Sequence, residues 1–168
     1  MFELTTPFII SQILVGLAMI SDFLSFQFKK REHILIFFCV SASLISVHYF
    51  LLNKIAAAVF IFFSVLRFII SYFTTNTKVL YFFIFLNCIS LFFTYQELYD
   101  FILFIALNIA IFASFQKNDQ KMRQFFMIGT SGVILYNITI FTPVGIIMET
   151  SFLLSNFIGY YRYYLRKT

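Results

Sequence analysis

Long apolar segments, separated by short polar hinges, recur along the whole chain of 168 residues. They cover residues 7–28, 33–53, 55–73, 79–95, 101–115, 125–141 and 143–164. An α-helix needs about 20 residues to cross the apolar core of a bilayer, so the pattern predicts an all-α, polytopic membrane protein with seven transmembrane helices. The fifth segment is short and is expected to need cover from its neighbours. The longest polar hinge, 116–124, leaves no room for a domain outside the membrane.

The composition excludes a soluble globule. Hydrophobic residues make up 61% of the chain and charged residues 11%, with a mean hydropathy of +0.93, whereas soluble domains carry about 25% charged residues. The net charge of +5 does not indicate nucleic acid, because the basic residues lie in the hinges and not along one recognition stripe. The first segment is expected to be retained, since the N-terminus carries Glu3 and lacks the basic region of a signal peptide.

The distribution of basic residues predicts the orientation of the chain. One side of the predicted membrane holds most of them: Lys29, Lys30, Arg31, Lys78, Lys117, Lys121, Arg123, Arg162, Arg166 and Lys167. Cytoplasmic hinges are enriched in Lys and Arg, so we expect the N-terminus outside and the C-terminus in the cytoplasm. The acidic hinge 95–100 then lies outside, and the four tyrosines of 160–164 form an aromatic belt at the inner interface.

The two ends of the chain resemble each other. A shift of 89 residues without gaps aligns thirteen identical residues between positions 13 and 73, where the composition gives about five by chance. This predicts one membrane domain, 1–168, with a first three-helix repeat in 1–73, a linker helix in 79–95 and a second three-helix repeat in 101–168. A single linker helix gives both repeats the same orientation, so matched residues lie at the same depth. The polar matches are His48 with Asn137, Arg67 with Asn156, and Ser41 with Thr130.

Polar side chains inside the apolar segments are the candidates for function, because such groups are costly in hydrocarbon unless they are partnered or hydrated. Glu149 and Asn156 lie seven residues apart, and therefore on one face of the last segment, which must look inward. The solute-binding or gating candidates are Asn156, Glu149, Asn137, His48, Arg67, Asp22 and Gln12. Asn156 and Asn137 are the better solute ligands, because an amide donates and accepts without carrying charge.

Each candidate also has a structural interpretation. Asp22 and Arg67 both lie nearer the inner side, so we expect an ion pair that either staples the first repeat or contacts the solute. Glu149 and His48 lie nearer the outer side, where they form a proton relay or cation site, or an interhelical hydrogen bond that only fixes packing. Arg67 is expected to face Asn156 across the axis between the repeats, with Glu149 at the outer mouth.

At 48–52 (HYFLL) and 149–156 (ETSFLLSN), followed by Arg162, the chain resembles bacterial inner-membrane proteins of the YgjV type. The likeness extends through nearly the whole chain and includes Gln12 and the basic hinge FKKRE. It implies a location in the bacterial inner membrane and no particular mechanism. Such proteins carry histidine where this chain has Tyr136, just before Asn137, and this difference weakens a proton-coupling role at that position.

The 3+1+3 layout is also similar to that of SWEET, PQ-loop and nicotinamide-riboside-type carriers, which move small neutral or weakly charged solutes. This is a likeness of architecture alone. The Pro-Gln dipeptide of PQ-loop proteins is missing, and the chain has no tryptophan, the residue with which sugar carriers of this architecture commonly stack on their substrates. A sugar is therefore disfavoured as the solute.

Neither enzymatic nor metal chemistry is expected. The segment GTSG, 129–132, matches the G-x-S-G pattern of rhomboid-type intramembrane proteases, but His33 and His48 both precede it, whereas the base of those enzymes lies on a later helix. The glycines of 129–132 are expected to allow close helix packing instead. Cys39 and Cys88 lie in separate apolar segments and are expected to be buried thiols. No cofactor is expected.

Two functional classes remain. The first is a carrier or facilitator for a small polar solute, in which the two repeats rock around a site in the middle of the membrane. The second is a non-transporting structural or regulatory membrane protein, whose intramembrane polar residues only fix helix packing. In both classes the lipid bilayer surrounds the protein and nucleic acid is no partner, and assembly into a homo-oligomer is left open.

Overall fold

The computed structural model describes residues 6–51, 55–95, 97–139 and 143–166. Within these ranges the chain forms seven α-helices, a short terminal π-helix and no strand, which confirms the all-α prediction. The helices are α1 (Thr6–Ser25), α2 (Arg31–Leu51), α3 (Ile55–Phe73), α4 (Thr77–Thr94), α5 (Asp100–Ser114), α6 (Asp119–Thr139) and α7 (Pro143–Tyr160), followed by η1 (Tyr161–Leu165).

Most helix bounds lie within three residues of those predicted, but α6 begins at Asp119, six residues before the predicted start of its segment at 125. The reason is a cap within the polar hinge. The Asn118 side chain accepts from the backbone N–H of Lys121 at 2.9 Å, and the Asn118 carbonyl accepts from Met122, also at 2.9 Å. A side-chain acceptor at this position satisfies the open N–H groups of a first turn. The hinge 116–124 is therefore largely helical.

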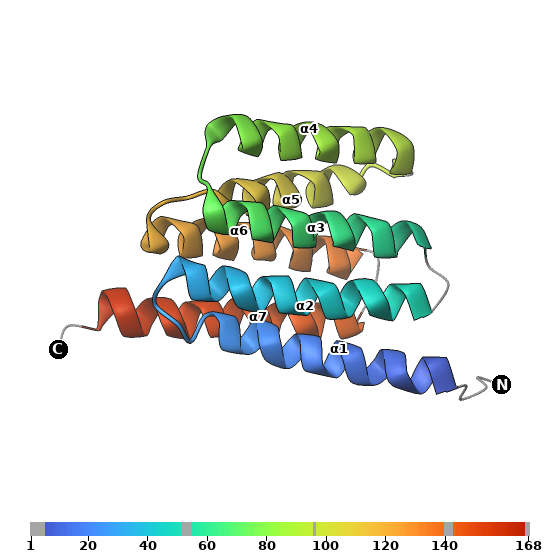
Figure 1. Cartoon of the computed structure of the whole chain (residues 1–168), viewed down its shortest axis with the longest axis horizontal. Helices are drawn as coiled ribbons and strands as arrows, with labels where there is room; N and C mark the ends of the chain where they lie inside the picture. Colours follow the sequence, from blue (N-terminus) through green and yellow to red (C-terminus); the bar gives the residue numbers. More distant parts are fainter. Residues whose placement is uncertain (1–5, 52–54, 96, 140–142, 167–168) are drawn as a thin grey trace.

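The helices lie side by side with α4 at one edge (Figure 1), and the contacts of the other six form a ring. Contacts join α1 to α2, α2 to α3, α5 to α6 and α6 to α7, and the contacts of α3 with α5 and of α7 with α1 close the ring. The edge helix, α4, packs on α5 through an apolar cluster of Leu80, Phe83, Ile111 and Phe115. Because α4 lies at the edge, Cys88 is exposed and the prediction of a buried thiol there is wrong, whereas Cys39 is half-buried against the core.

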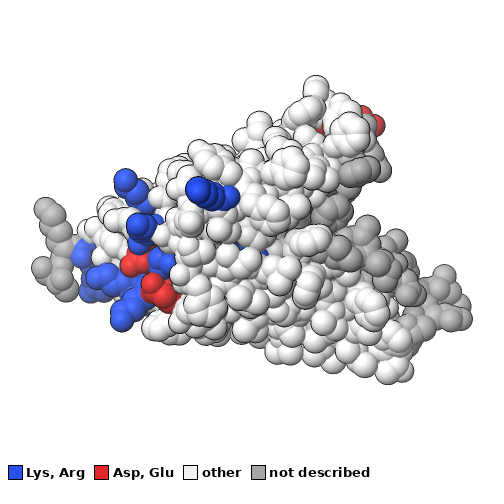
Figure 2. All heavy atoms as spheres, turned by 45° about the horizontal axis from the view of Figure 1, so that its top comes forward, with Lys and Arg blue, Asp and Glu red and all other residues white. Residues whose placement is uncertain are grey.

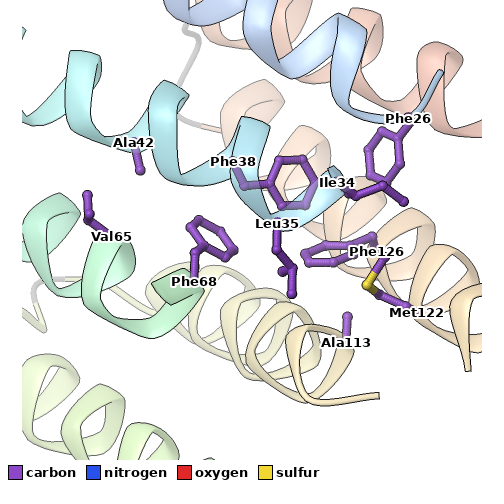
Figure 3. Close-up of a cluster of buried hydrophobic side chains, with 10 residues drawn as sticks. All are labelled: Phe26, Ile34, Leu35, Phe38, Ala42, Val65, Phe68, Ala113, Met122 and Phe126. Atoms are coloured by element: carbon purple, nitrogen blue, oxygen red, sulfur yellow. The ribbon is translucent and has the colours of Figure 1, made fainter. Parts of the chain in front are cut away.

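A cluster of ten buried side chains fills the ring near the hinges that follow α1 and α5 (Figure 3). Its centre is aromatic. The ring centroid of Phe38 lies 5.3 Å from that of Phe26, 5.2 Å from Phe68, 5.1 Å from Phe126 and 5.3 Å from Phe152. These five rings come from the hinge after α1 and from α2, α3, α6 and α7. Close packing of this kind is a main source of attraction between helices in a membrane, so the aromatic centre holds α1, α2 and α3 against α6 and α7.

Figure 2 shows the Lys and Arg side chains gathered at one end of the bundle, which we call the basic end. There the odd-numbered helices end and the even-numbered helices begin (Figure 1); we call the opposite end the far end. Large apolar side chains cover much of the other surface, and the exposed fractions of Phe73, Phe92 and Leu98 reach 79%, 82% and 76%. Apolar groups exposed on this scale are suited to contact with lipid.

The helix bounds change the expected correspondence between the two ends of the chain. Helix α2 covers 31–51 and α6 covers 119–139, an offset of 88, and α3 and α7 begin at 55 and 143, which is the same offset. The predicted offset of 89 holds for the ends of α1 and α5, at Ser25 and Ser114. Burial agrees, because the buried positions 34, 35, 38, 41 and 42 recur as the buried positions 122, 123, 126, 129 and 130.

A shorter hinge explains this change of offset. The hinge between α1 and α2 covers 26–30, whereas the hinge between α5 and α6 covers 115–118 and is one residue shorter. After this hinge the helix bounds follow an offset of 88, one less than the offset behind the predicted polar matches. At the offset of 88, Ser41 aligns with Gly129, His48 with Tyr136 and Arg67 with Ser155.

Candidate solute site

Two carboxylates from opposite ends of the chain come together inside the ring. Asp22 of α1 lies beside the Ser41 hydroxyl of α2 and within electrostatic reach of Glu149 of α7. Both carboxylates are half-buried. The sequence placed Asp22 toward the inner side and Glu149 toward the outer side. The structure brings them within electrostatic reach because α1 and α7 are neighbours in the ring.

Contacts farther along the same two helices fix the depth of this pair. Ser155 of α7 donates to the carbonyl of Phe23 and accepts from Gln27 Nε2 at 3.1 Å. Asp22 therefore lies near the level of Ser155, and Glu149 lies six residues, about 9 Å, farther toward the far end. Two like charges in a medium of low dielectric repel, so protonation of one carboxyl, or a cation bound near both, lowers their energy.

Arg67 does not join this pair, so the predicted ion pair between Asp22 and Arg67 is wrong. Arg67 is 9% exposed, and its guanidinium carbon lies 4.5 Å from the ring centroid of the neighbouring Phe68. Among the described residues Arg67 makes no hydrogen bond or ion pair, and its Nε is buried without a partner. It is a buried cation in the middle of α3 with an aromatic neighbour and no counter-charge in the described chain.

His48 and Gln12 both contact Ser11, near the far end of α1. His48 Nδ1 lies 3.0 Å from the carbonyl oxygen of Ser11, and Gln12 Nε2 donates to the Ser11 hydroxyl at 3.3 Å. His48 is half-buried and Gln12 is exposed. The contact of His48 thus joins α2 to α1. At the corresponding position on α6, Tyr136 lies 6.0 Å, between ring centroids, from Tyr99 at the start of α5.

Asn156 serves helix packing in this structure. It is 1% exposed, and its Nδ2 donates to the carbonyl of Arg123 on α6 at 2.9 Å, while its Oδ1 has no partner within the described chain. The register change makes Ser155, not Asn156, the counterpart of Arg67, so the expected facing pair of Arg67 and Asn156 has lost its basis. Asn137 is half-buried near the far end of α6.

Two buried arginines at the basic end were not among the predicted site residues. Arg31 Nη2 donates to the carbonyls of Ser71 at 2.6 Å and Ser114 at 3.0 Å, at the ends of α3 and α5. Arg123 Nη1 donates to the carbonyl of Phe26 at 3.0 Å, and Nη2 donates to that of Phe28, beyond the end of α1.

These arginines bind the carbonyl ends of helices, where a cation is favoured by the open C=O groups and by the helix dipole. Arg31 and Arg123 are 6% and 0% exposed. The sequence counted both among the cytoplasmic charges of the hinges. Their burial depends on the closing contacts of the ring, α3 with α5 and α7 with α1, which the hydropathy pattern does not contain.

Part of the predicted tyrosine belt also packs on the protein. Tyr163 donates to the carbonyl of Gln27, and the hydroxyl of Tyr160 accepts from Gln120 Nε2 at 3.0 Å and from Gln124 Nε2 at 2.8 Å. The C-terminal turn is thereby held against α6 and against the hinge after α1.

The GTSG segment lies where α6 packs closely on α5. A Cβ atom added at Gly129 would lie 3.1 Å from the carbonyl oxygen of Ala106, and one added at Gly132 would lie 2.8 Å from the Ala106 Cβ. The Ser131 hydroxyl donates to the carbonyl of Met127 in its own helix at 2.9 Å. These contacts confirm the close-packing role predicted for the two glycines.

An open groove on α5 and α6 is lined by Phe104, Ile105, Asn108, Ile109, Phe112 and Phe125. None of the predicted solute residues lines it, so it is not the predicted site between the repeats. Within the described ranges, no three His, Cys, Asp or Glu side chains are placed to hold a metal ion together.

The fold and its apolar surface define a helical membrane protein. Two helical stretches, Thr6–Ser25 and Arg31–His48, are by themselves long and apolar enough to cross a bilayer, and Ile61–Phe73, Thr77–Phe92 and Asp100–Ser114 are shorter apolar helices. The chain matches the model of the family Imp-YgjV, described as bacterial inner membrane protein, over residues 9–167, and it belongs to that family. Comparison with curated proteins and with solved structures gives no match.

Proposed function

We propose that this inner-membrane protein is a carrier or facilitator for a small polar solute, in which two halves, α1–α3 and α5–α7, rock against each other. The observation that carries the proposal is the concentration of hydrogen bonds between the halves at the basic end. There Gln27, Arg31 and the carbonyls of Phe23, Phe26 and Phe28 bond to partners on α5, α6 and α7. Within the described residues these bonds gather at the basic end, and closure of one end at a time is what alternating access requires of each of its two states.

The helix bounds support the 3+1+3 arrangement. Helices α2 and α6 have equal length, and α3 and α7 start at the same offset from them. The two closing contacts of the ring, α3 with α5 and α7 with α1, exchange with each other when the halves are exchanged. Helix α4 lies outside this exchange, as a linker that gives both halves the same orientation does. The likeness to SWEET and PQ-loop carriers belongs to this proposal.

The distribution of charge supports seven spans with the N-terminus outside and the C-terminus in the cytoplasm. The basic end takes the cytoplasmic side, because positive residues are retained there. Glu97, in the hinge between α4 and α5, and Asp100, the first residue of α5, lie at the opposite end of the bundle and fall outside. In this orientation the basic end, where hydrogen bonds join the halves, faces the cytoplasm. The structure then corresponds to a state closed toward the cytoplasm.

The carboxylate pair supplies the chemistry of the proposed carrier. Asp22 comes from the first half and Glu149 from the second, so movement of one half against the other changes their separation. Protonation of one of the two carboxyls, or a cation bound near both, stabilises the state in which they are closer together. This links a bound cation to the conformation of the halves, which is the basis of coupled transport.

One set of observations favours the second class, a non-transporting membrane protein. Asn156, Ser155, Arg31 and Arg123 are all buried and all bond to other helices. These polar groups fix packing and leave little capacity for a solute. The carboxylate pair and Arg67 are not taken up by such bonds, so the two classes are best separated at these residues.

The test is the variant Glu149→Gln, with the exposed hinge carboxylate variant Glu97→Gln as the matched control. Cells that overexpress each form, and cells that lack the protein, are compared by untargeted analysis of small polar metabolites in cells and medium. For a carrier, the wild type and Glu97→Gln shift at least one solute, and Glu149→Gln abolishes that shift while its amount in the membrane is unchanged. A loss of folded protein without any solute effect would instead assign Glu149 to packing.

A further inference from the structure

Arg67 differs from the other two buried arginines of the bundle. All three leave Nε without a partner, but Arg31 and Arg123 each bond two carbonyls through their terminal nitrogens. Arg67 has no such bond among the described residues, although more than nine-tenths of its surface is buried. Contact with the face of Phe68 compensates only a small part of the energy of a buried, unpaired charge.

The position of Arg67 places it between the halves. It lies four residues, one turn, before Ser71 on α3, and therefore on the same face of that helix. The carbonyl of Ser71 meets Arg31, which also bonds α5, so this part of α3 lies beside the other half. The corresponding residue of the other half, Ser155, lies on the contact of α7 with α1 and bonds Phe23 and Gln27 there.

We propose that Arg67 binds an anionic group, a carboxylate or phosphate, of the transported solute. This inference rests on the proposed carrier function and adds the chemical class of the substrate. A guanidinium presents parallel N–H donors that match two oxygens of a carboxylate or phosphate. Neither Asp22 nor Glu149 acts electrostatically on Arg67, so the carboxylates inside the ring do not supply its counter-charge. The missing negative charge is therefore brought by the ligand.

The route to Arg67 follows from the same contacts. The hydrogen bonds of Arg31 with Ser71 and Ser114 close the basic end of the contact between α3 and α5. Arg67 lies about 6 Å from that closure in the direction of the far end. In the proposed cycle the anion comes to Arg67 from the far end, and its release to the other side requires that the bonds of Arg31 open.

The experiment measures the melting temperature of the purified full-length protein in neutral detergent at fixed pH and ionic strength. The probes are inorganic phosphate, pyruvate and succinate, with glycerol as the neutral control and phosphatidylglycerol as the lipid arm. We expect at least one soluble anion to raise the melting temperature of the wild type by about 3 °C or more. The same anion leaves Arg67→Met unchanged and acts weakly on Arg67→Lys, because an ammonium lacks the fork of donors.

Matched variants separate this role from a structural one. Without added anion, Arg67→Met melts no lower than the wild type, since it replaces an unpaired charge with an apolar chain of similar length. Arg31→Met and Arg123→Met melt lower, because they remove hydrogen bonds to helix ends.

Absence of stabilisation by every soluble anion would overturn the inference, as would stabilisation by phosphatidylglycerol alone, or an unchanged anion effect in Arg67→Met. The outcome is independent of the metabolite experiment on Glu149. Anion binding without any solute shift would remove the carrier function and keep the site, whereas a solute shift without anion binding would do the reverse.

Discussion

At the scale of single residues, the basic end leaves almost no free space. A Cβ atom added at Gly159 of α7 would overlap the carbonyl oxygen of Phe26 and the Nη1 atom of Arg123. The glycine lets α7 approach the end of α1 closely enough for Arg123 to reach its carbonyls. Gly16 of α1 is the opposite case, because an added Cβ atom would meet nothing within 4 Å. The two glycines thus offer the same substitution in a filled and in an open environment.

We predict that Gly159→Ala destabilises the protein by about 1–3 kcal/mol, the usual range for overpacking, because backbone and guanidinium would both have to move. Gly16→Ala is expected to be neutral or to stabilise by up to about 1 kcal/mol, since alanine has the higher helix propensity. Thermal unfolding of both variants in detergent checks the difference. Equal melting temperatures for the two variants would show that the close contact at Gly159 does not exist.

The sequence predicts which residues lie at the candidate site better than it predicts which of them contact each other. The rule that polar groups inside apolar segments are costly picked out Asp22, Glu149 and Arg67, each of which the structure places inside the bundle. It paired Asp22 with Arg67 because both lay at one predicted depth, and depth says nothing about which helices are neighbours. The closing contact of α7 with α1, which brings Glu149 to Asp22, depends on tertiary packing that no single segment encodes.

At the scale of helices, the starts of α2 and α6 are linked to each other. The Asp119 side chain, at the first residue of α6, accepts from the backbone N–H of Arg31, at the first residue of α2, at 3.0 Å. It therefore caps a helix that lies 88 residues earlier in the chain. The same Arg31 then binds the ends of α3 and α5 through its side chain. One hydrogen-bonded group thus joins four helix ends at the basic end.

We predict that Asp119→Ala lowers the free energy of unfolding by about 1 kcal/mol, the typical cost of losing a cap. Asp119→Asn should lose less, because its amide oxygen remains an acceptor. Lys121→Ala, at an exposed position two residues away, is the control and should change little. The measurement is chemical or thermal unfolding in detergent. If the alanine variant at 119 were as stable as the control, the bond between the two helix starts would contribute nothing.

The helices themselves followed from the hydropathy pattern, since long apolar segments between polar hinges mark them directly. Hydropathy does not mark the start of α6, because the residues after the capping Asn118 are polar although their backbone is already helical. The offset of 89 residues predicted from the sequence is one residue larger than the offset of 88 between the bounds of α2 and α6. An alignment without gaps cannot represent a hinge that is shorter by one residue, and identical residues in α1 and α5 dominated the match.

At the scale of the whole molecule, the proposed orientation makes the basic end cytoplasmic. Lys30 lies in the hinge between α1 and α2, and Leu98 lies in the hinge between α4 and α5, where its side chain is 76% exposed. These two positions are on opposite ends of the bundle. They test the orientation without touching the candidate site.

We predict that, once Cys39 and Cys88 have been replaced by alanine, a cysteine at Leu98 reacts with a membrane-impermeant maleimide in intact cells. A cysteine at Lys30 should react only after the inner membrane is opened, because positive hinges are retained in the cytoplasm. Labelling of both positions before and after lysis reports the two sides. Labelling of the Lys30 position from outside would show that the orientation, and with it the direction of access to Arg67, is the opposite of the one proposed.

If the two halves rock as proposed, the hydrogen bonds at the basic end act as the pivot of that motion. Helices α2 and α6 have 21 residues each, which corresponds to an arm of about 30 Å. A tilt of one half by about 10° around the basic end would move its far end by about 5 Å, roughly the width of a small solute. A small angular change, too slight to disturb the aromatic centre near the fulcrum, is then enough to open or close a passage at the other end.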